Sequence, residues 1–172
     1  MKFLIASDIH GSAYWCEQLL AAVEFENADK LILLGDLLYH GPRNDFPDEY
    51  APKKVFAMLN AIKDKIVCVR GNCDFTSTIG SCEVPKVDSI TLMGKKIVYT
   101  HGDLYGVKYG FSGLERLAEN TGADLVLFGH THTPISIYKD GIYYFNPGSL
   151  RDGCYGVVDI TPNGIICINK KL

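Results

Sequence analysis

The sequence has little of what marks secreted, membrane or nucleic-acid-coating proteins. Its six cysteines include no CxxC pair, and its lysines and arginines form no cluster, with a net charge of −3. The apolar run at residues 3–6 is far shorter than a signal-peptide core or a membrane span. We therefore expect a cytoplasmic protein with reduced thiols, no membrane partner and no nucleic-acid-coating surface. A glycine-rich phosphate loop carrying a lysine is also missing.

The 172 residues have the composition of an ordinary globular protein, with 47% hydrophobic and 22% charged residues. This length suits one domain with a hydrophobic core, and no internal repeat, low-complexity tract or linker divides it. We expect residues 1–172 to form a single domain. Residues 39–51 are the one long polar stretch, and loops of this length are often functional.

The first half of the chain alternates apolar runs with helical patterns. Apolar runs predict strands at residues 2–6, 31–34 and 66–69. Helices are expected to begin at Ser12 and at Pro52, since proline suits a first helical turn. The inward face of the second helix is predicted to carry Val55, Phe56, Leu59 and Ile62.

The second half contains more hairpins. Residues 89–100 predict a hairpin turning at Gly94-Lys95, and Ser112 with Glu115 predicts a capping box before a helix that ends at Gly122. Turns are expected at Asp140-Gly141 and Asn163-Gly164. Further strands are predicted at residues 125–128, 135–138, 142–145, 155–159 and 165–168. Together the two halves indicate an α/β fold of two packed sheets with helices outside.

Polar clusters follow five of the predicted strands. The carboxyl ends of such strands are where ligands gather in α/β sheets. Side chains at these tips would surround one crevice, and they are Asp8, His10, Asp36, Asn72, His101, His130 and His132. Each cluster alone also has a structural explanation, such as an Asx turn or a surface histidine. Five coincidences at strand ends favour a functional site.

These residue types suit divalent cations. Imidazole and carboxylate together favour manganese, iron, zinc, nickel or cobalt, whereas structural zinc sites are rich in thiolates. Side chains two residues apart in an extended segment share a face, so Asp8 and His10 can bind one cation. Glycines at positions 35, 71, 102 and 129 leave room for sharp backbone turns beside the ions.

In order and spacing, Asp8-x-His10, Gly35-Asp36, Gly71-Asn72-x-Asp74, His101 and Gly129-His-x-His132 resemble the calcineurin-like metallophosphoesterase superfamily. The loop from Gly35 to Asn44 and the segment Asn146-Pro-Gly-Ser149 are similar to its small phosphodiesterase branch, typified by YfcE. The resemblance covers about residues 1–160. It implies a four-layer α/β/β/α sandwich of two mostly mixed sheets flanked by helices.

The resemblance also implies two divalent cations, manganese first, with iron, nickel, zinc, cobalt or magnesium as alternatives. Asp36 would bridge them and the pair would share a hydroxide that attacks phosphorus. One cation would be held by Asp8, His10, Asp36 and His132, and the other by Asp36, Asn72, His101 and His130. Asn72 and His101 would take part in catalysis as well as in binding metal, and Asn72 would also contact the substrate.

This chain departs from the superfamily pattern at two positions. Many members have a histidine where Cys73 stands, as a proton donor to the leaving group, and relatives of this branch often have a histidine at Asp103. A thiol is a poor general acid, so we expect diesters with good leaving groups, with His40 as a substitute acid. Arg43 and Cys73 are expected to contact the substrate. Asp74 is expected to fix its loop or to orient a ligand, rather than to transfer a proton.

The expected activity is hydrolysis of small phosphodiesters or nucleotide-like substrates. Two alternatives stay open: a phosphomonoesterase of the same fold, and a non-catalytic scaffold like the retromer subunit of the superfamily. Exposed side chains at Tyr14 and Trp15 would favour the scaffold. Assembly into a homo-oligomer is also open.

Overall fold

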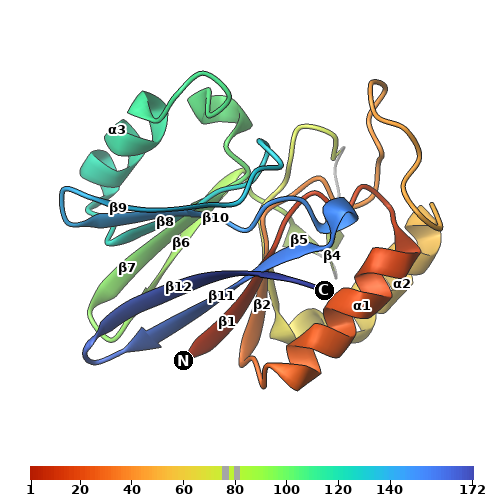
Figure 1. Cartoon of the computed structure of the whole chain (residues 1–172), viewed down its shortest axis with the longest axis horizontal. Coiled ribbons are helices and arrows are strands. Elements are labelled where there is room, and N and C mark those ends of the chain that lie inside the picture. Colours follow the sequence, from red (N-terminus) through yellow and green to blue (C-terminus); the bar gives the residue numbers. More distant parts are fainter. Residues whose placement is uncertain (75–77, 80–81) are drawn as a thin grey trace.

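Two five-stranded sheets lie face to face between helices, which gives four layers (Figure 1). A computed structural model describes residues 1–74, 78–79 and 82–172, and the side chains of 78–79 and 82–83 are outside this description. The elements of the helix–strand first half are β1 (Lys2–Ala6), α1 (Ala13–Phe25), β2 (Lys30–Leu33), α2 (Pro52–Ala61), η1 (Lys63–Lys65) and β3 (Ile66–Cys68). Those of the second half are β4 (Thr78–Ile79), β5 (Cys82–Glu83), β6 (Val87–Leu92), β7 (Lys95–Thr100), η2 (Asp103–Tyr105), α3 (Ser112–Thr121), β8 (Leu125–Leu127), β9 (Ile135–Lys139), β10 (Ile142–Asn146), η3 (Leu150–Asp152), β11 (Cys154–Thr161) and β12 (Gly164–Lys171).

Both large sheets are mixed. The first sheet has the order β12-β11-β1-β2-β3, and β1, β2 and β3 run parallel. The second sheet has the order β6-β7-β8-β10-β9, and β7, β8 and β10 run parallel. Helices α1 and α2 cover the first sheet and α3 covers the second (Figure 1). The predicted α/β/β/α sandwich is confirmed.

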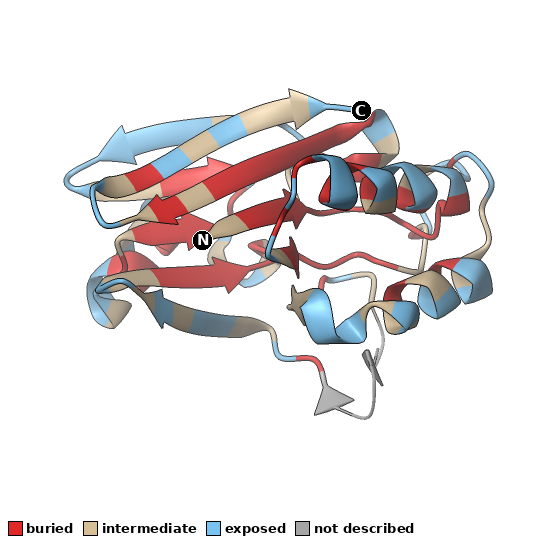
Figure 2. Cartoon of the chain, turned by 90° about the horizontal axis from the view of Figure 1, so that it is seen from below, coloured by how far each residue is buried: buried red, intermediate tan, exposed pale blue. Residues whose placement is uncertain are grey.

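Three layers of core separate these four layers, and strand periodicity explains them. Along β1, Leu4 and Ala6 face α1 and α2, whereas Phe3 and Ile5 face the other sheet. On β8, Leu125 and Leu127 face the first sheet and Val126 faces α3. Central strands are thus buried on both faces, as Figure 2 shows. This explains why their sequences are continuous apolar runs.

Several local predictions were wrong. Phe56 is 41% exposed, so the buried face of α2 comprises Val55 and Leu59 without it. No side chain caps α3, and Ser112 is its first helical residue, because Phe111 holds the N-cap position. The β6–β7 turn is centred one residue earlier than predicted, on Met93-Gly94, where both residues have positive φ.

Other expectations hold. Ser12 caps α1 by accepting a hydrogen bond from the Trp15 backbone N–H at 3.2 Å. Gly122 ends α3 in the left-handed conformation. The cysteines with described side chains are free thiols, as predicted, while the Cys82 side chain lies outside the description. Among the described residues, no helix is long and apolar enough to cross a membrane.

Candidate metal centre

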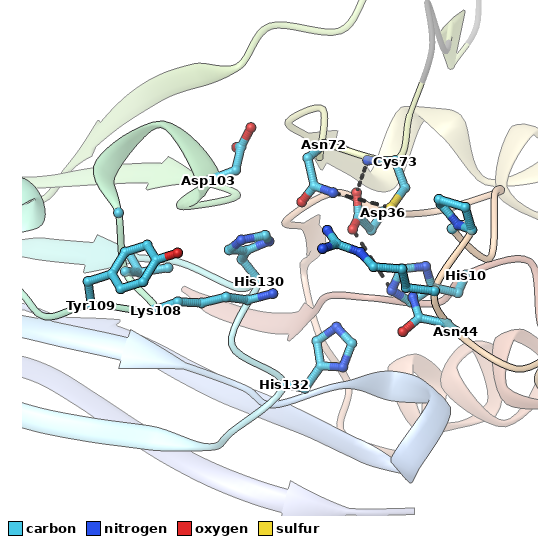
Figure 3. A pocket seen from close by; sticks show the side chains of 15 residues that line it. His10, Asp36, Asn44, Asn72, Cys73, Asp103, Lys108, Tyr109, His130 and His132 are labelled. Carbon is cyan, nitrogen blue, oxygen red and sulfur yellow. Dashed lines mark hydrogen bonds and ion pairs between the residues drawn. The ribbon is translucent and has the colours of Figure 1, made fainter.

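The predicted strand tips converge on one crevice between the two sheets. Asp8 and His10 follow β1, Asp36 follows β2 and Asn72 follows β3, all in the first sheet. From the second sheet, His101 follows β7, and His130 and His132 follow β8. Figure 3 shows His10, Asp36, Asn72, His130 and His132 around one cavity. The structure therefore brings together side chains that lie up to 124 positions apart, since the set runs from Asp8 to His132.

Within the crevice, donor atoms form two clusters. Asp8, His10 and His132 make up the first, in which Asp8 Oδ1 lies 3.6 Å from His10 Nε2 and 3.2 Å from His132 Nε2. The second consists of Asp36, His101 and His130. There His101 Nε2 lies 3.0 Å from His130 Nδ1 and 3.1 Å from Asn72 Oδ1. Each cluster offers donors close enough for a single cation.

Asp36 stands between the two clusters. Its Oδ2 lies 3.8 Å from His10 Nε2 and 3.4 Å from His101 Nε2. The other oxygen, Oδ1, accepts a hydrogen bond from the Cys73 backbone N–H at 2.7 Å. The carboxylate is thereby held with one oxygen facing both clusters, which is the geometry that a bridging ligand needs.

The buried histidines are oriented by backbone carbonyls. His10 Nδ1 lies 2.9 Å from the Tyr39 oxygen, and His101 Nδ1 lies 2.8 Å from the Leu34 oxygen. A carbonyl only accepts, so in each ring Nδ1 carries the hydrogen and donates it. The lone pair of Nε2 then points into the crevice. Such carbonyl partners commonly orient metal-binding imidazoles.

Unpartnered buried atoms test whether this donor set fits a cation. Among the described residues, Asp8 Oδ1 and His10 Nε2 are buried and make no hydrogen bond. Leaving such atoms without a partner costs about 1–3 kcal/mol each. Both atoms are acceptors that face the crevice, and a divalent cation would satisfy both. The residues therefore fit the metal.

Electrostatics in the crevice favour positive charge. Burial alone would raise the pKa of Asp8, but the neighbouring imidazoles of His10, His132 and His101 hold its pKa well below its ordinary value. Burial opposes protonation of His101, yet its hydrogen bond with Asp36 and the nearby carboxylates raise its pKa to about 9. Burial, His101 and Lys108 lower the pKa of His130 to about 4. Because protons and cations compete for these donors, cation binding would release protons.

The backbone at the tips is strained. Five of the seven predicted ligands have φ between 50° and 66°, which is uncommon outside glycine: Asp8, His10, Asp36, His130 and His132. Strain of about 1–3 kcal/mol per residue persists at sites where function requires it. Two glycines permit the packing, because a Cβ on Gly71 would lie 2.0 Å from Asp36 Oδ1 and one on Gly129 would lie 2.0 Å from Ser7 Oγ.

Two further side chains hold the ligand loops. The Asp74 carboxylate accepts hydrogen bonds from the backbone N–H groups of Asp36, Leu37 and Gly71, at 2.8, 2.9 and 3.0 Å. Asp74 therefore fixes its loop, as predicted. Asn146, at the end of β10, donates to the Gly129 carbonyl at 2.9 Å and so supports the loop that carries His130.

The cavity has a volume of about 480 Å³, and its wall includes Arg43 and Cys73 as predicted. His40 does not line it, because its ring packs among Tyr39, Phe46 and Tyr50. The structure therefore gives no geometric support for His40 as an acid. Burial raises the pKa of the Cys73 thiol to about 12, so Cys73 is also a poor proton donor.

Sequence reasoning missed two lysines near the cavity, Lys86 and Lys108, although it considered Tyr109 as a residue that could stack on a base. Lys108 and Tyr109 line the cavity on the loop after η2 (Figure 3). Lys86 donates to the Gly71 carbonyl at 2.8 Å and to Asp103 Oδ2 at 3.1 Å, which joins the loops after β3 and β7. No motif marks these lysines, so no signal in the sequence could have identified them.

Fold and site together define an α/β sandwich with a candidate dinuclear cation centre at its strand tips. Residues 1–161 match the calcineurin-like phosphoesterase superfamily domain, and the chain belongs to this family. It is therefore a metallophosphoesterase, a hydrolase of phosphoester bonds.

Three relatives illustrate the range of similarity. The phosphodiesterase YfcE of Escherichia coli K12 is 36% identical over 180 residues, which cover 99% of this chain and 94% of YfcE. The solved structure of this E. coli phosphoesterase superposes with a TM-score of 0.77 at 34% identity, covering 99% of each chain. The metallophosphoesterase YsnB of Bacillus subtilis, itself named as probable, is 30% identical over 88% of this chain and 76% of its own. Zinc-bound Vps29 of Entamoeba histolytica shares the fold, with a TM-score of 0.71 at 17% identity over 99% of each chain.

Proposed function

We propose that this chain is a single domain that hydrolyses small phosphodiesters with two divalent cations. One cation would be held by Asp8, His10, Asp36 and His132, and the other by Asp36, Asn72, His101 and His130. The observation that carries the proposal is the position of Asp36 Oδ2, 3.8 Å from His10 Nε2 and 3.4 Å from His101 Nε2. When bound, such a pair of cations activates water as a nucleophile and withdraws charge from the phosphoryl group.

The chain's own residues position the substrate around this centre. The exposed guanidinium of Arg43 lies on the cavity wall, where it can donate two parallel hydrogen bonds to phosphoryl oxygens. Asn72 is exposed to the cavity, so its side chain can also contact the phosphoryl group. Buried His10 and His101 are held by backbone carbonyls, which keeps their Nε2 atoms aimed inward.

A diester is favoured over a monoester by the residue beside Asn72. A monoester with a poor leaving group benefits most from a proton donor, and the Cys73 thiol is a poor one because burial raises its pKa to about 12. The relation to the phosphodiesterase YfcE supports the same choice. Substrates would be small diesters or nucleotide-like molecules, which suit a cavity of about 480 Å³.

The test compares bis-p-nitrophenyl phosphate with p-nitrophenyl phosphate at matched Mn²⁺ concentration. We expect kcat/KM to be higher for the diester. Faster turnover of the monoester would instead support a phosphomonoesterase of the same fold. No turnover of either ester by metal-loaded protein would support the scaffold alternative. Of the two side chains whose exposure would favour it, Tyr14 is 40% exposed, whereas Trp15 is partly buried against the core.

Manganese as the native metal and a cytoplasmic location belong to this proposal. The mixed oxygen and nitrogen donors suit manganese, and iron, zinc, cobalt or nickel also fit them. Metal analysis of protein purified without added metal would identify the cation. Fractionation of the source cells would test the location.

A further inference from the structure

Cys73 adds a sulfur donor to the rim of the centre. The donor atoms of Cys73, His10 and Asp36 all lie within 4.8 Å of one another. Cys73 is half-buried and lines the cavity, and Figure 3 shows its sulfur beside Asp36. The three side chains come from the loops after β3, β1 and β2, so the fold itself brings them together.

The His10 imidazole also indicates that a ligand belongs beside Cys73. The side chain is 1% exposed, and its Nε2 is buried without a hydrogen-bond partner in the described part of the chain. Because Nδ1 donates to the Tyr39 carbonyl at 2.9 Å, the Nε2 lone pair faces the space shared with Asp36 and Cys73. A cation placed there meets nitrogen, oxygen and sulfur.

The thiol is also held in place. Asn72 Nδ2 donates to Cys73 Sγ at 3.2 Å, and the Cys73 backbone N–H donates to Asp36 Oδ1 at 2.7 Å. A Cβ at Gly41 would lie 3.1 Å from Sγ. The lack of a side chain at Gly41 therefore leaves room for this sulfur atom.

We propose that Cys73 is a third donor, with His10 and Asp36, for thiophilic cations such as zinc and cadmium. Thiolate is a soft ligand that selects such cations, whereas manganese and magnesium prefer oxygen. On binding, a sulfur–metal bond forms as the S–H bond breaks, and the proton leaves to solvent without any redox change. The inference rests on the proposed metal centre and adds a selectivity that the other seven ligands do not give.

One functional consequence follows. A sulfur bound to the cation on the cavity side occupies a position that a phosphoryl oxygen would need. Zinc and cadmium should therefore inhibit the manganese-loaded enzyme more strongly than nickel or magnesium does. This inhibition should weaken when the sulfur is removed.

Cobalt(II) substitution provides a test that is independent of turnover. A cobalt–thiolate bond gives an intense near-ultraviolet charge-transfer band, while cobalt in nitrogen and oxygen sites gives only weak visible bands. We expect the charge-transfer band in the wild type and in the control Cys167→Ala, whose thiol lies on β12. The band should be lost in Cys73→Ser, with the visible bands retained, and the affinity for cadmium should fall at least about tenfold, ~1.4 kcal/mol.

Three results would contradict the proposal, and they distinguish failure of the sulfur donor from failure of the whole metal centre. Visible bands without a charge-transfer band in the wild type would refute the sulfur donor and leave the metal centre standing. A charge-transfer band that survives in Cys73→Ser would refute it as well, because another thiol would be the donor. If cobalt does not bind the wild type at all, the metal centre and the sulfur donor both fail.

Discussion

Asp36 is the residue on which both donor clusters depend. Replacing it with asparagine keeps the shape of the side chain and the hydrogen bond from the Cys73 backbone N–H, but removes the negative charge between His10 and His101. We expect Asp36→Asn to lower kcat/KM for bis-p-nitrophenyl phosphate by at least about 100-fold, ~2.7 kcal/mol in barrier. Circular dichroism should show an intact fold. Activity within about tenfold of wild type would remove Asp36 from the bridging role.

Gly71 controls the position of the same carboxylate. A Cβ at this residue would lie 2.0 Å from Asp36 Oδ1 and 2.4 Å from the Asp36 backbone nitrogen, so Gly71→Ala must displace Asp36. We expect loss of bound metal and of most activity, measured by metal analysis and by diester hydrolysis. A matched control is Gly94→Ala in the β6–β7 turn, where the new Cβ meets nothing within 4 Å. The control should cost about 1 kcal/mol of stability, because φ is +74°, and leave activity unchanged.

At this scale the sequence predicted which side chains would meet but not how they are held. Asp8 and His130 could be identified because polar residues directly after buried strands are unusual and gather at one sheet edge. Their positive φ values could not be predicted, since they follow from tertiary hydrogen bonds such as the His130 N–H to Asp8 Oδ2 at 3.2 Å. His40 was proposed as an acid from its place in a long loop, and loop conformation determines instead that its ring packs on Tyr50.

The loops after β3 and β7 are joined by one lysine. Lys86 bonds to the Gly71 carbonyl and to Asp103, and thereby links the loop of Asn72 to that of His101. We expect Lys86→Met to raise the metal concentration needed for half-maximal activity by about 3–10-fold, ~0.7–1.4 kcal/mol. Activity at saturating metal should fall much less, because the ligands themselves remain.

A control for Lys86, which precedes β6, is available on β9 at the opposite edge of the second sheet. Lys139 pairs with Glu115 at 2.6 Å, and its side chain is 55% exposed. Exposed pairs contribute little, so Lys139→Met should leave both the metal dependence and the activity as in wild type. If the two substitutions changed the metal dependence equally, Lys86 would act only through the net charge of the protein and not through its bonds to the two loops.

Elements were predicted well where burial is two-sided and less well where one face is exposed. Apolar runs such as β1 and β8 have cores on both faces, so no alternative element fits them. On the surface helix α2, Phe56 was assigned to the inward face together with Val55, Leu59 and Ile62, but this residue is 41% exposed. The sequence could not exclude an inward Phe56, because the limits of a buried helix face are poorly defined when only a few apolar residues predict it.

On the scale of the whole molecule, Glu26, which directly follows α1, binds the two C-terminal strands. Its carboxylate accepts hydrogen bonds from Lys170 Nζ at 2.6 Å on β12 and from the Tyr155 hydroxyl at 2.9 Å on β11. The hydrogen bond from Lys170 holds the pKa of Glu26 below its ordinary value. A carboxylate with a lowered pKa in the folded state stabilises the fold above its unfolded pKa, and this contribution is lost as pH falls.

The expected outcome is a pH-dependent difference between wild type and Glu26→Gln. Near pH 7, the variant should lose about 1–3 kcal/mol of unfolding free energy, because a charged hydrogen-bond acceptor is replaced by a neutral one. The gap should narrow at acidic pH, as the pH falls below the ordinary pKa of a glutamate toward the lowered pKa of Glu26 in the folded state. Urea unfolding of both proteins at pH 7 and at acidic pH would measure this difference in unfolding free energy. A stability difference that grows at acidic pH would contradict the lowered pKa of Glu26.

Four of the seven candidate ligands belong to one sheet and three to the other: Asp8, His10, Asp36 and Asn72 on one side, and His101, His130 and His132 on the other. Cations bound between them would act as cross-links across the sandwich, in the way that a disulfide joins distant segments. At about 100 times Kd, bound cation adds about 2.7 kcal/mol of stability. For a chain of this size, chelation should therefore lower Tm by about 5–10 °C, and the melting temperature would report cation availability.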